Sequence, residues 1–476
     1  MAEQDRPPWR RTRTKRVNPP RPKELGVLIT SRRRVWTRNL VCTLLVSGLL
    51  TVVQPAAIAS SAGKPRVVVG VIDSPPNPYH SFFYKGSPIY KSQGPSSVTP
   101  AVLKEFGIDR SHTIKVTRTG NFNADFKKDK AIFDGINAGE PYWFKGTNVI
   151  AISFMGERER LRPEAGSAHG VGTGSAVLTA NPEAVVVMVE SPGDNSLPGQ
   201  PGFATRPMGE EWAFNHPAID IVSTSYGPPY SPPLMYHLTN SYVGVVNKGK
   251  LHFGASDNSP APSPVDATSG PWWTVGIAGY LEGEGGDRTL QSGSLPDFLA
   301  DFIQTLPYCR ACEKGTDKVS GTSFSTPLTA GVASRILLEA RRAASHAGGI
   351  VTKRVKTPLM VKDGKDSLTN WQIRRALEEA AYYPTMSEYT PGGPGYPIVE
   401  QAPWAVSGWG LITSDPDKKV VKEALAHLGV RGSTTRDKAG APCDFMTANM
   451  EMRKHYWNNS IHSESNGTEK YPYIAC

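Results

Sequence analysis

The chain has 476 residues, of which 39% are apolar and 20% charged, and no low-complexity tract, so we expect a globular protein with one large or two medium-sized domains. The formal net charge is +10, but twelve of the 53 Lys and Arg residues and only three of the 43 Asp and Glu residues lie within residues 1–59. The remaining 41 basic and 40 acidic residues nearly balance. This balance argues against a nucleic-acid partner, because such a protein needs a surplus of positive charge on its body.

Residues 1–59 have the features of a signal peptide with a long basic n-region. The basic stretch SRRRVWTR precedes an uncharged apolar run from Leu40 to Val53, and the small residues Ala57–Ala59 offer a cleavage site. We therefore expect the leader to engage the export machinery and the protein to be secreted. The alternative is a membrane anchor, if the leader is not cleaved. The apolar run has fourteen residues, however, and a membrane-spanning helix needs about 20.

Six runs rich in β-branched residues indicate short strands, at 66–73, 148–154, 184–190, 219–225, 251–256 and 274–280. They are apolar nearly throughout, as strands are when a parallel sheet is covered on both faces. Helical patterns are clearest at 326–343 and 367–381. Alternating strands and helices predict an α/β fold over 60–430, with a doubly wound, mostly parallel sheet and helices on both faces. Within it, the weak periodicity of 74–146 predicts long surface excursions.

Four cysteines remain when Cys42 in the leader is set aside: Cys309, Cys312, Cys443 and Cys476. An even number in an exported chain indicates disulfides, and four cysteines allow three pairings. Our hypothesis is that the pairs closest in sequence form, which would make 431–476 a disulfide-stapled C-terminal extension. A zinc site at the C-x-x-C of 309–312 is disfavoured, because no second C-x-x-C or H-x₃-H accompanies it. We assign no metal ligands.

Three polar residues stand where parallel sheets form their sites, at the carboxyl ends of strands and the amino ends of helices. Asp73 ends the first strand, His169 opens a glycine-rich turn into a helix, and Ser323 opens a helix within SGTSFSTPLTAGVAS. A nucleophilic serine needs a base within hydrogen-bond reach and a group that orients the base. An acid, an imidazole and a hydroxyl at neighbouring sheet ends could together meet those needs.

These segments resemble the motifs of the subtilisin-like serine proteases, the subtilases. GTSFSTPLTAGVAS resembles the nucleophile motif, VVVGVIDSP the aspartate motif and AHGVGTGSA the histidine motif, and the similarity extends over about 66–427. The order of the three residues is also the Asp-His-Ser order of subtilisin. The resemblance implies that Ser323 is the nucleophile, that His169 is its base and that Asp73 orients the base.

Two further segments resemble parts of the family that contact substrate. FGASDNSP resembles the segment that holds the oxyanion asparagine, which here is Asn258. VSTSYG resembles the strand that pairs with extended substrate, which here would act through Ser225, Tyr226 and Gly227. The resemblance therefore implies an oxyanion hole at Asn258 and a substrate-binding strand end at residues 225–227.

The chain departs from the family pattern in three places. Gly172 stands where the family often has a second histidine, which is not the base, and Asp257 stands where a glycine normally precedes the oxyanion asparagine. The stretch from Ala59 to Asp73 leaves no room for the folding propeptide that many secreted subtilases carry. We expect disulfide formation, or folding before export, to assist folding in its place.

The resemblance implies a secreted serine endopeptidase that acts as a monomer and hydrolyses a peptide or protein substrate through an acyl-enzyme. No cofactor is required, and structural calcium, which supports many subtilases, cannot be assigned to particular residues. The alternative is a degenerate subtilase that binds peptides without efficient cleavage, which Asp257 would favour. A nucleotide-binding enzyme and an α/β-hydrolase are disfavoured, because the chain has no G-x-G-x-x-G after a strand and no G-x-S-x-G.

Overall fold

A computed structural model describes residues 65–461, apart from 158, 165–166, 191–205, 227–231, 257, 259–267, 283–287, 292–295, 348–367, 383–407, 418 and 435–442. The chain divides into two units, Met1–Ser61 and Ala62–Cys476, and the described residues all belong to the second. The expected leader, Gly227, Asp257 and Cys476 therefore lie outside the described residues.

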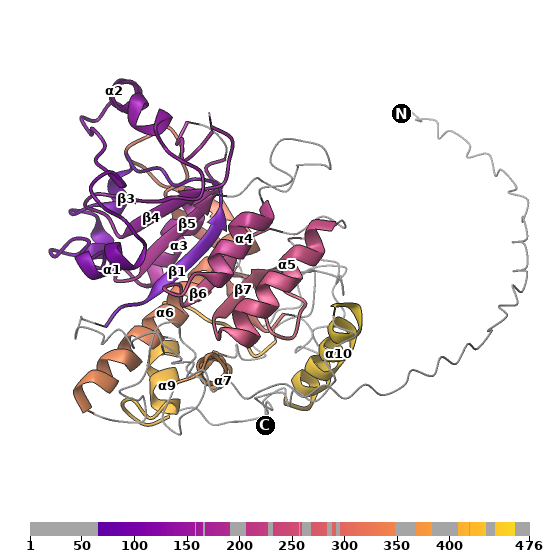
Figure 1. Ribbon diagram of the computed structural model, residues 1–476. Coiled ribbons are helices and arrows are strands. Elements are labelled where there is room, and N and C mark those ends of the chain that lie inside the picture. Colours follow the sequence, from indigo (N-terminus) through magenta and orange to yellow (C-terminus); the bar gives the residue numbers. More distant parts are fainter. Residues whose placement is uncertain are drawn as a thin grey trace, which may run out of the picture. The chain divides into compact units, whose positions relative to one another are not determined.

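The centre of this unit is a ten-stranded sheet (Figure 1). The strand order is β10-β8-β7-β6-β1-β5-β4-β3-β2, with β9 paired to β8 beside this path. All pairs are parallel except β3–β4 and β8–β9. The strands are β1 (Val68–Asp73), β2 (Thr113–Ile114), β3 (Pro141–Phe144), β4 (Val149–Ser153), β5 (Val185–Glu190), β6 (Ile221–Thr224), β7 (Leu251–Ala255), β8 (Val275–Glu282), β9 (Arg288–Gln291) and β10 (Phe298–Asp301). A separate antiparallel hairpin is formed by β11 (Ile303–Leu306) and β12 (Asp317–Ser320).

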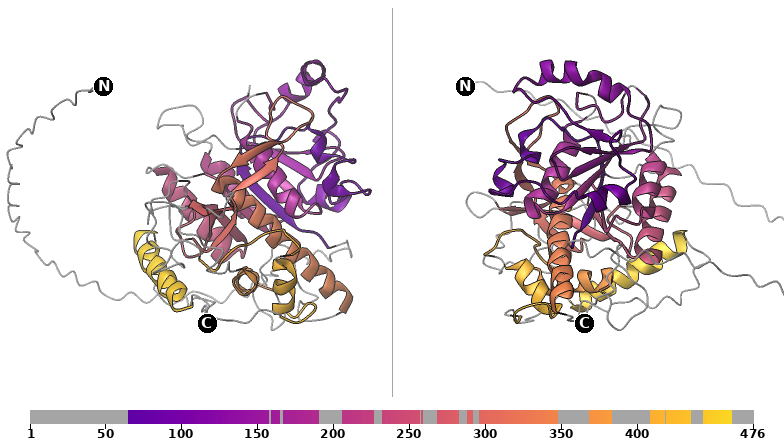
Figure 2. Two further views of the ribbon diagram at one scale, coloured as in Figure 1. Left: turned by 180° about the vertical axis from the view of Figure 1, so that it is seen from behind. Right: turned by 60° about the vertical axis from the view of Figure 1, so that its left-hand side comes forward.

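The expected doubly wound α/β fold is confirmed, and side chains from the central strands pack into cores on both faces. In β1, Val69 and Val71 belong to the core that includes α3 and α6, whereas Val68 and Ile72 belong to the core that includes α4. Because both faces are covered, the strands are apolar throughout, which is why their sequences do not alternate. Figures 1 and 2 show α4 and α5 on one face and α6 on the other. The helices on the two faces are α3 (His169–Ala180), α4 (Arg206–Asn215), α5 (Pro232–Tyr242) and α6 (Thr322–Ala347). A π-helical turn, η3 (Val243–Asn247), follows α5.

The expectation that 74–146 forms surface excursions is wrong. The region contributes β2 and β3 to the sheet, and Tyr79, Phe133 and Phe144 from it are almost completely buried. Large aromatic side chains, spaced irregularly along a chain rich in Gly and Pro, bury apolar surface here without the regular spacing that marks a helix or strand. Its other elements are η1 (Ser81–Phe83), η2 (Pro88–Tyr90), α1 (Pro100–Glu105) and α2 (Phe122–Asp134).

Three helices complete the C-terminal part of the unit. α7 (Asn370–Ala380) matches the expected helix at 367–381, and its N-cap Thr369 forms a capping box with Gln372. α9 (Val420–His427) packs against α7, and α10 (Cys443–Ile461) lies where the sequence has little periodicity. Within the described ranges, we find no helix with the length and apolar character needed to cross a membrane.

A buried ion pair fixes helix α6 to the amino-terminal edge of the sheet. Arg341 donates two hydrogen bonds to the carboxylate of Asp220, at 2.9 and 2.7 Å, in bidentate geometry. Asp220 also accepts the backbone N–H of Val68, the first residue of β1, at 2.9 Å. The two side chains are only 6% and 0% exposed, so water does not replace either partner. The far end of α6 is therefore tied to the beginning of β1.

We predict that Arg341→Met lowers the free energy of unfolding by about 3–5 kcal/mol, because it leaves the Asp220 carboxylate buried without its cation. Urea unfolding followed by circular dichroism measures the change. Arg335→Met is the matched control, since Arg335 is an exposed arginine on the same helix, and its effect should stay within about 0.5 kcal/mol. Equal losses in the two variants would contradict a structural role for the ion pair.

Candidate active site

Asp73 and His169, two of the three residues expected to act together, are in direct contact. Asp73 is the last residue of β1 and His169 is the first residue of α3. The distances from His169 Nδ1 to Asp73 Oδ1 and Oδ2 are 2.9 and 2.8 Å. Asp73 also accepts the backbone N–H of Ser74 at 2.7 Å and the hydroxyl of Thr173 at 3.1 Å. These donors hold the carboxylate in one orientation, and the carboxylate in turn holds the imidazole.

The start of helix α3 is locked to the residue that follows Asp73. The Ser74 hydroxyl accepts the backbone N–H of Gly170 at 2.7 Å. A Cβ at Gly170 would overlap the Ser74 carbonyl oxygen, so this approach requires glycine. Neither Ser74 nor Thr173 was identified from the sequence. Thr173 lies one helical turn after His169, and this spacing was the one available signal that it faces the same carboxylate.

Glu190 is the register partner of Asp73 on the neighbouring strand β5. Its side chain accepts the backbone N–H of Leu161 at 2.7 Å, which anchors the chain segment that leads to His169. Leu161 is completely buried and has a φ of 50°, a left-handed conformation that needs such support in a residue other than glycine. Burial raises the pKa of Glu190 to about 7, because a low-dielectric surrounding disfavours the charged carboxylate.

Ser323, the third expected residue, is the second residue of α6, and the residue after it contacts His169. The ring of Phe324, the next residue, is 5.2 Å from the His169 ring between centroids. The Ser323 hydroxyl donates to the carbonyl oxygen of Ser225 at 3.1 Å. In return, the Ser225 hydroxyl donates to the carbonyl oxygen of Ser323 at 2.8 Å. The two serines thus form a reciprocal pair between the end of β6 and the start of α6.

Pro327, inside helix α6, explains why Ser225 is needed. In a regular helix, the N–H of residue 327 would donate to the carbonyl oxygen of residue 323, but proline has no N–H. The Ser225 hydroxyl supplies the missing donor. The proline therefore directs the Ser323 carbonyl toward the strand end that is expected to bind substrate.

Asn258 lies directly against the turn that precedes Ser323. Its Oδ1 accepts the backbone N–H of Thr322 at 2.8 Å and the Thr322 hydroxyl at 2.9 Å. Because Oδ1 is engaged by Thr322, Nδ2 is the donor end of this amide. The Ser323 N–H is in the first turn of α6, where backbone donors have no partner within the helix. Asn258 is thus bonded to the residue that precedes Ser323 in the chain.

The expected substrate-binding residues are placed only in part. Ser225 is 5% exposed and engaged with Ser323. The Tyr226 hydroxyl donates to Glu210 of α4, a carboxylate that is 1% exposed. Glu210 was not identified from the sequence, although it precedes the buried Phe214 by one helical turn and so lies on the inner face of α4. Gly227 lies outside the described residues.

The C-x-x-C segment is bound to the chain just after β1. The sulfur atoms of Cys309 and Cys312 are in contact, and their Cα atoms are 5.8 Å apart, as in a disulfide. Asn77 Nδ2 donates to both of their carbonyl oxygens, at 3.0 and 2.7 Å. The pairing of Cys443 with Cys476 stays a prediction, since it involves a residue outside the described ranges. No group of three His, Cys, Asp or Glu residues among those described is arranged to hold a metal ion.

A family model with the description "Subtilase family" matches residues 64–381. The solved structures similar to this chain include the prenylagaramide maturation protease PagA, at 15% identity over 78% of this chain and 96% of that chain, with a TM-score of 0.40. A lanthipeptide protease is 13% identical over 76% and 88% of the two chains, with a TM-score of 0.41. Proteases from Pseudoalteromonas arctica are 16% identical over 75% and 90%, with a TM-score of 0.40. No curated protein matches the chain.

We predict that Ser225→Ala lowers the free energy of unfolding by about 1–3 kcal/mol, because the Ser323 carbonyl loses its donor. Pro327→Ala would restore an N–H at that carbonyl, so Ser225→Ala should cost less than half as much in a Pro327→Ala background. Urea unfolding of the four variants of this double-mutant cycle measures both losses. A Ser323→Ala background prevents self-digestion during the measurement. The same loss with proline and with alanine at 327 would show that Ser225 does not compensate for the proline.

Proposed function

The chain belongs to the subtilase family, whose model matches residues 64–381, and we propose that it is a serine endopeptidase that hydrolyses peptide bonds through an acyl-enzyme. The observation that carries this proposal is the contact between His169 Nδ1 and the Asp73 carboxylate, at 2.9 and 2.8 Å, together with the contact of the His169 ring with Phe324, the residue after Ser323. A base that is oriented by a carboxylate next to a hydroxyl is the arrangement that nucleophilic catalysis by serine requires.

In the proposed reaction, His169 donates its Nδ1 proton to Asp73 in a hydrogen bond and uses Nε2 as the base. The Ser323 hydroxyl turns from the Ser225 carbonyl toward Nε2, transfers its proton and attacks the carbonyl carbon of the scissile peptide bond. The imidazolium then gives this proton to the leaving amine, and the acyl group stays on Ser323. A water molecule, deprotonated by the same nitrogen, hydrolyses the ester. The Asp73 carboxylate stabilises the imidazolium through the same hydrogen bond.

The negative charge that develops on the substrate oxygen would be stabilised by two donors. One is the backbone N–H of Ser323, at the positive end of the α6 dipole. The other is Asn258 Nδ2, the donor end of an amide whose Oδ1 is held by the Thr322 N–H. Two donors that are already fixed before the reaction need no reorganisation when the charge develops, which is the main advantage of an oxyanion hole.

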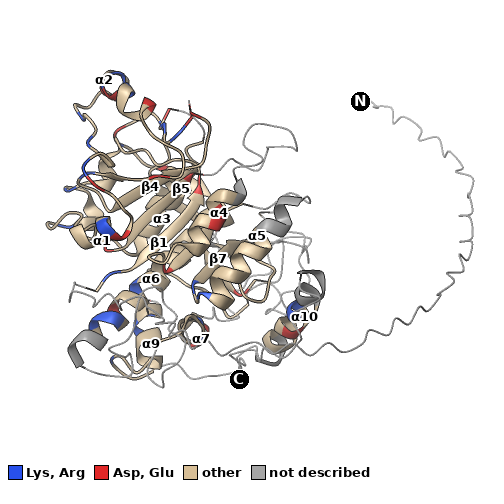
Figure 3. Cartoon of the chain, viewed as in Figure 1, with Lys and Arg blue, Asp and Glu red and all other residues tan. Residues whose placement is uncertain are grey.

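We propose peptide or protein substrates that lie in extended form along residues 225–227. Figure 3 shows Lys and Arg interspersed with Asp and Glu on the described elements, a pattern that favours such substrates over nucleic acid. The reaction needs no cofactor, because nucleophile, base and oxyanion donors all come from the chain. Calcium, if bound, would have a structural role and take no part in the reaction. We further propose that 1–59 directs export to the outside of the cell, that 60–430 is the peptidase domain of a monomer, and that 431–476 is a disulfide-stapled extension.

A second candidate function is that of a subtilase that binds peptides without efficient cleavage. The observation that favours it is the hydrogen bond from the Ser323 hydroxyl to the Ser225 carbonyl, at 3.1 Å, because a serine that kept this bond would not be deprotonated by His169. A fluorophosphonate probe distinguishes the two functions, since it reacts only with an activated serine.

We predict that Ser323→Ala lowers kcat/KM for peptide hydrolysis by about 10⁴-fold or more, because the triad residues act as a unit. The same substitution should abolish fluorophosphonate labelling. Ser111→Ala is the control, because Ser111 is a surface serine whose hydroxyl lies 3.2 Å from His112 Nδ1, and it should leave hydrolysis and labelling unchanged. A wild-type protein that binds peptides but takes up no probe would support the second candidate function.

We predict that Asn258→Ala lowers kcat by about 10²–10³-fold with little change in KM, since the donor acts on charge that appears only in the transition state. Steady-state kinetics with a peptide substrate provide both constants. The Thr322 N–H would lose its acceptor in this variant, so circular dichroism must first show that the fold is intact. An unchanged kcat in a folded variant would mean that the second oxyanion donor lies elsewhere.

A further inference from the structure

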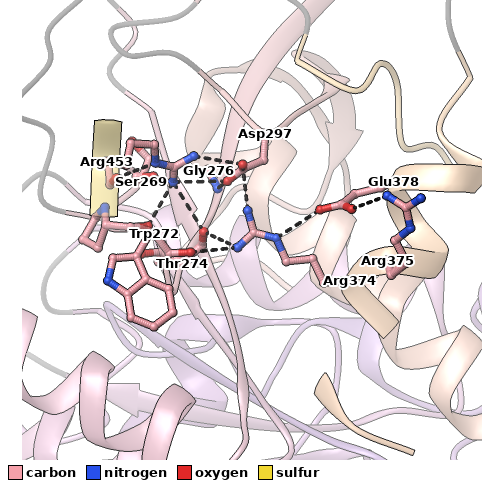
Figure 4. Close-up of polar contacts among 11 residues, drawn as sticks. Ser269, Trp272, Thr274, Gly276, Asp297, Arg374, Arg375, Glu378 and Arg453 are labelled. Atoms are coloured by element: carbon pink, nitrogen blue, oxygen red, sulfur yellow. Dashed lines mark hydrogen bonds and ion pairs between the residues drawn. The ribbon is translucent and has the colours of Figure 1, made fainter. Parts of the chain in front are cut away.

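Arg453, on α10, is a cation buried in the body of the unit (Figure 4). Its Nε donates to the carbonyl oxygen of Gly270 at 2.6 Å, and its Nη2 donates to those of Ser269 and Pro271, both at 2.9 Å. Its Nη1 donates to Asp297 at 2.9 Å. Only 6% of the residue is exposed. The guanidinium thus exchanges its hydration for three successive backbone carbonyls and one carboxylate.

The charge of Asp297 does not by itself require Arg453. Asp297 is completely buried and already accepts Arg374 Nη2 at 2.8 Å and the backbone N–H of Gly276 at 2.7 Å. Arg374 comes from α7 and also donates to the carbonyl oxygen of Thr274 at 2.9 Å. Arg374 Nε also lies 3.5 Å from Glu378 Oε1, and Arg375 lies 3.4 Å from Oε2, so the two carboxylates keep two arginines of α7 without α10. What Arg453 adds is a set of donors to residues 269–271.

Residues 268–271 lie directly against the end of strand β7. The Thr268 hydroxyl donates to the carbonyl oxygen of Ala255, the last residue of β7, at 2.9 Å. A Cβ at Gly254 would overlap the Thr268 carbonyl oxygen, so no side chain separates the two segments. Asn258 follows Ala255 by three residues. Thr322 of α6 binds this segment, because its hydroxyl donates to the Ser256 carbonyl oxygen and its N–H donates to the Asn258 side chain.

We propose that Arg453 is a positioning residue for peptide-bond hydrolysis. By holding 268–271 in place, it fixes the end of β7 and with it the position of the Asn258 amide relative to Ser323. The inference rests on the proposed function. The family match ends at residue 381, so this support comes from a part of the chain beyond the matched segment.

The test is a double-mutant cycle between Arg453→Ala and Asn258→Ala in the full chain. We measure kcat and KM for a peptide substrate well below the unfolding temperature of every variant. Arg453→Ala should lower kcat about tenfold or more, with KM within about twofold, because the oxyanion donor is displaced. In the Asn258→Ala background, where that donor is already missing, it should lower kcat by less than about twofold. Glu451→Ala, an exposed position on the same helix, should change neither constant.

A second variant, Arg453→Lys, separates charge from geometry. Lysine keeps a positive charge beside Asp297, but its single ammonium cannot reproduce the planar set of donors to three carbonyls. We therefore expect a loss of kcat similar to that of Arg453→Ala, and this variant carries the cycle if Arg453→Ala does not fold. Full kcat in either folded variant, or an equal loss with asparagine and with alanine at 258, overturns the proposal.

Fluorophosphonate labelling of Ser323, measured in parallel, distinguishes failure of this inference from failure of the proposed function. A wild-type protein that is not labelled overturns the proposed peptidase function, and the role of Arg453 in hydrolysis with it. A labelled, active wild type with unaffected Arg453 variants overturns the positioning role alone.

Discussion

Helices α3 and α6 approach each other closely at Gly331, and the geometry of the site depends on that contact. A Cβ at Gly331 would come within 2.6 Å of the Val177 carbonyl oxygen and 2.8 Å of the Ala180 Cβ. His169 is the first residue of α3 and Ser323 the second residue of α6. The separation of the two helices therefore sets the separation of base and nucleophile. Proton transfer between them requires heavy atoms about 2.6–3.2 Å apart, a tolerance that a single added methyl group would exceed.

The proline in α6 shows how a locally unfavourable residue serves the site. Pro327 deprives the Ser323 carbonyl of its helical partner, and Ser225 at the end of β6 provides the replacement. A break in helical hydrogen bonding is thus converted into a bond between helix and strand. Departures from local sequence rules are expected at functional sites, where the surrounding structure compensates for them.

The sequence predicted the central strands because burial on both faces leaves a continuous apolar run, as in β1 and β5. It also placed Asp73, His169 and Ser323 at element ends, as the structure has them, and the contact of Asp73 with His169 agrees with the expected pairing; their catalytic roles stay a prediction. It did not predict the buried aromatic residues of 74–146, which have no regular period. Nor did it predict Arg453, whose carboxylate partner is 156 residues away. Met446 and Met450 lie on the same helical face as Arg453 and are buried with it, but Met452 is exposed on another side, so the apolar residues of α10 do not by themselves single out the buried face.

The hydrogen bonds from Arg453 to the carbonyl oxygens of residues 269–271 also have a consequence for biosynthesis. The ribosome completes the three candidate triad residues and Asp297 well before it reaches α10, since chains emerge from the amino terminus onward. Until residue 453 has emerged, the carbonyl oxygens of 269–271 lack the donors that this arginine provides. A nascent chain thus contains Asp73, His169 and Ser323 before it contains Arg453, the residue proposed to hold the end of β7 in place. Translation order would delay full hydrolytic capacity and so limit the damage that a growing chain could do to itself and to its neighbours.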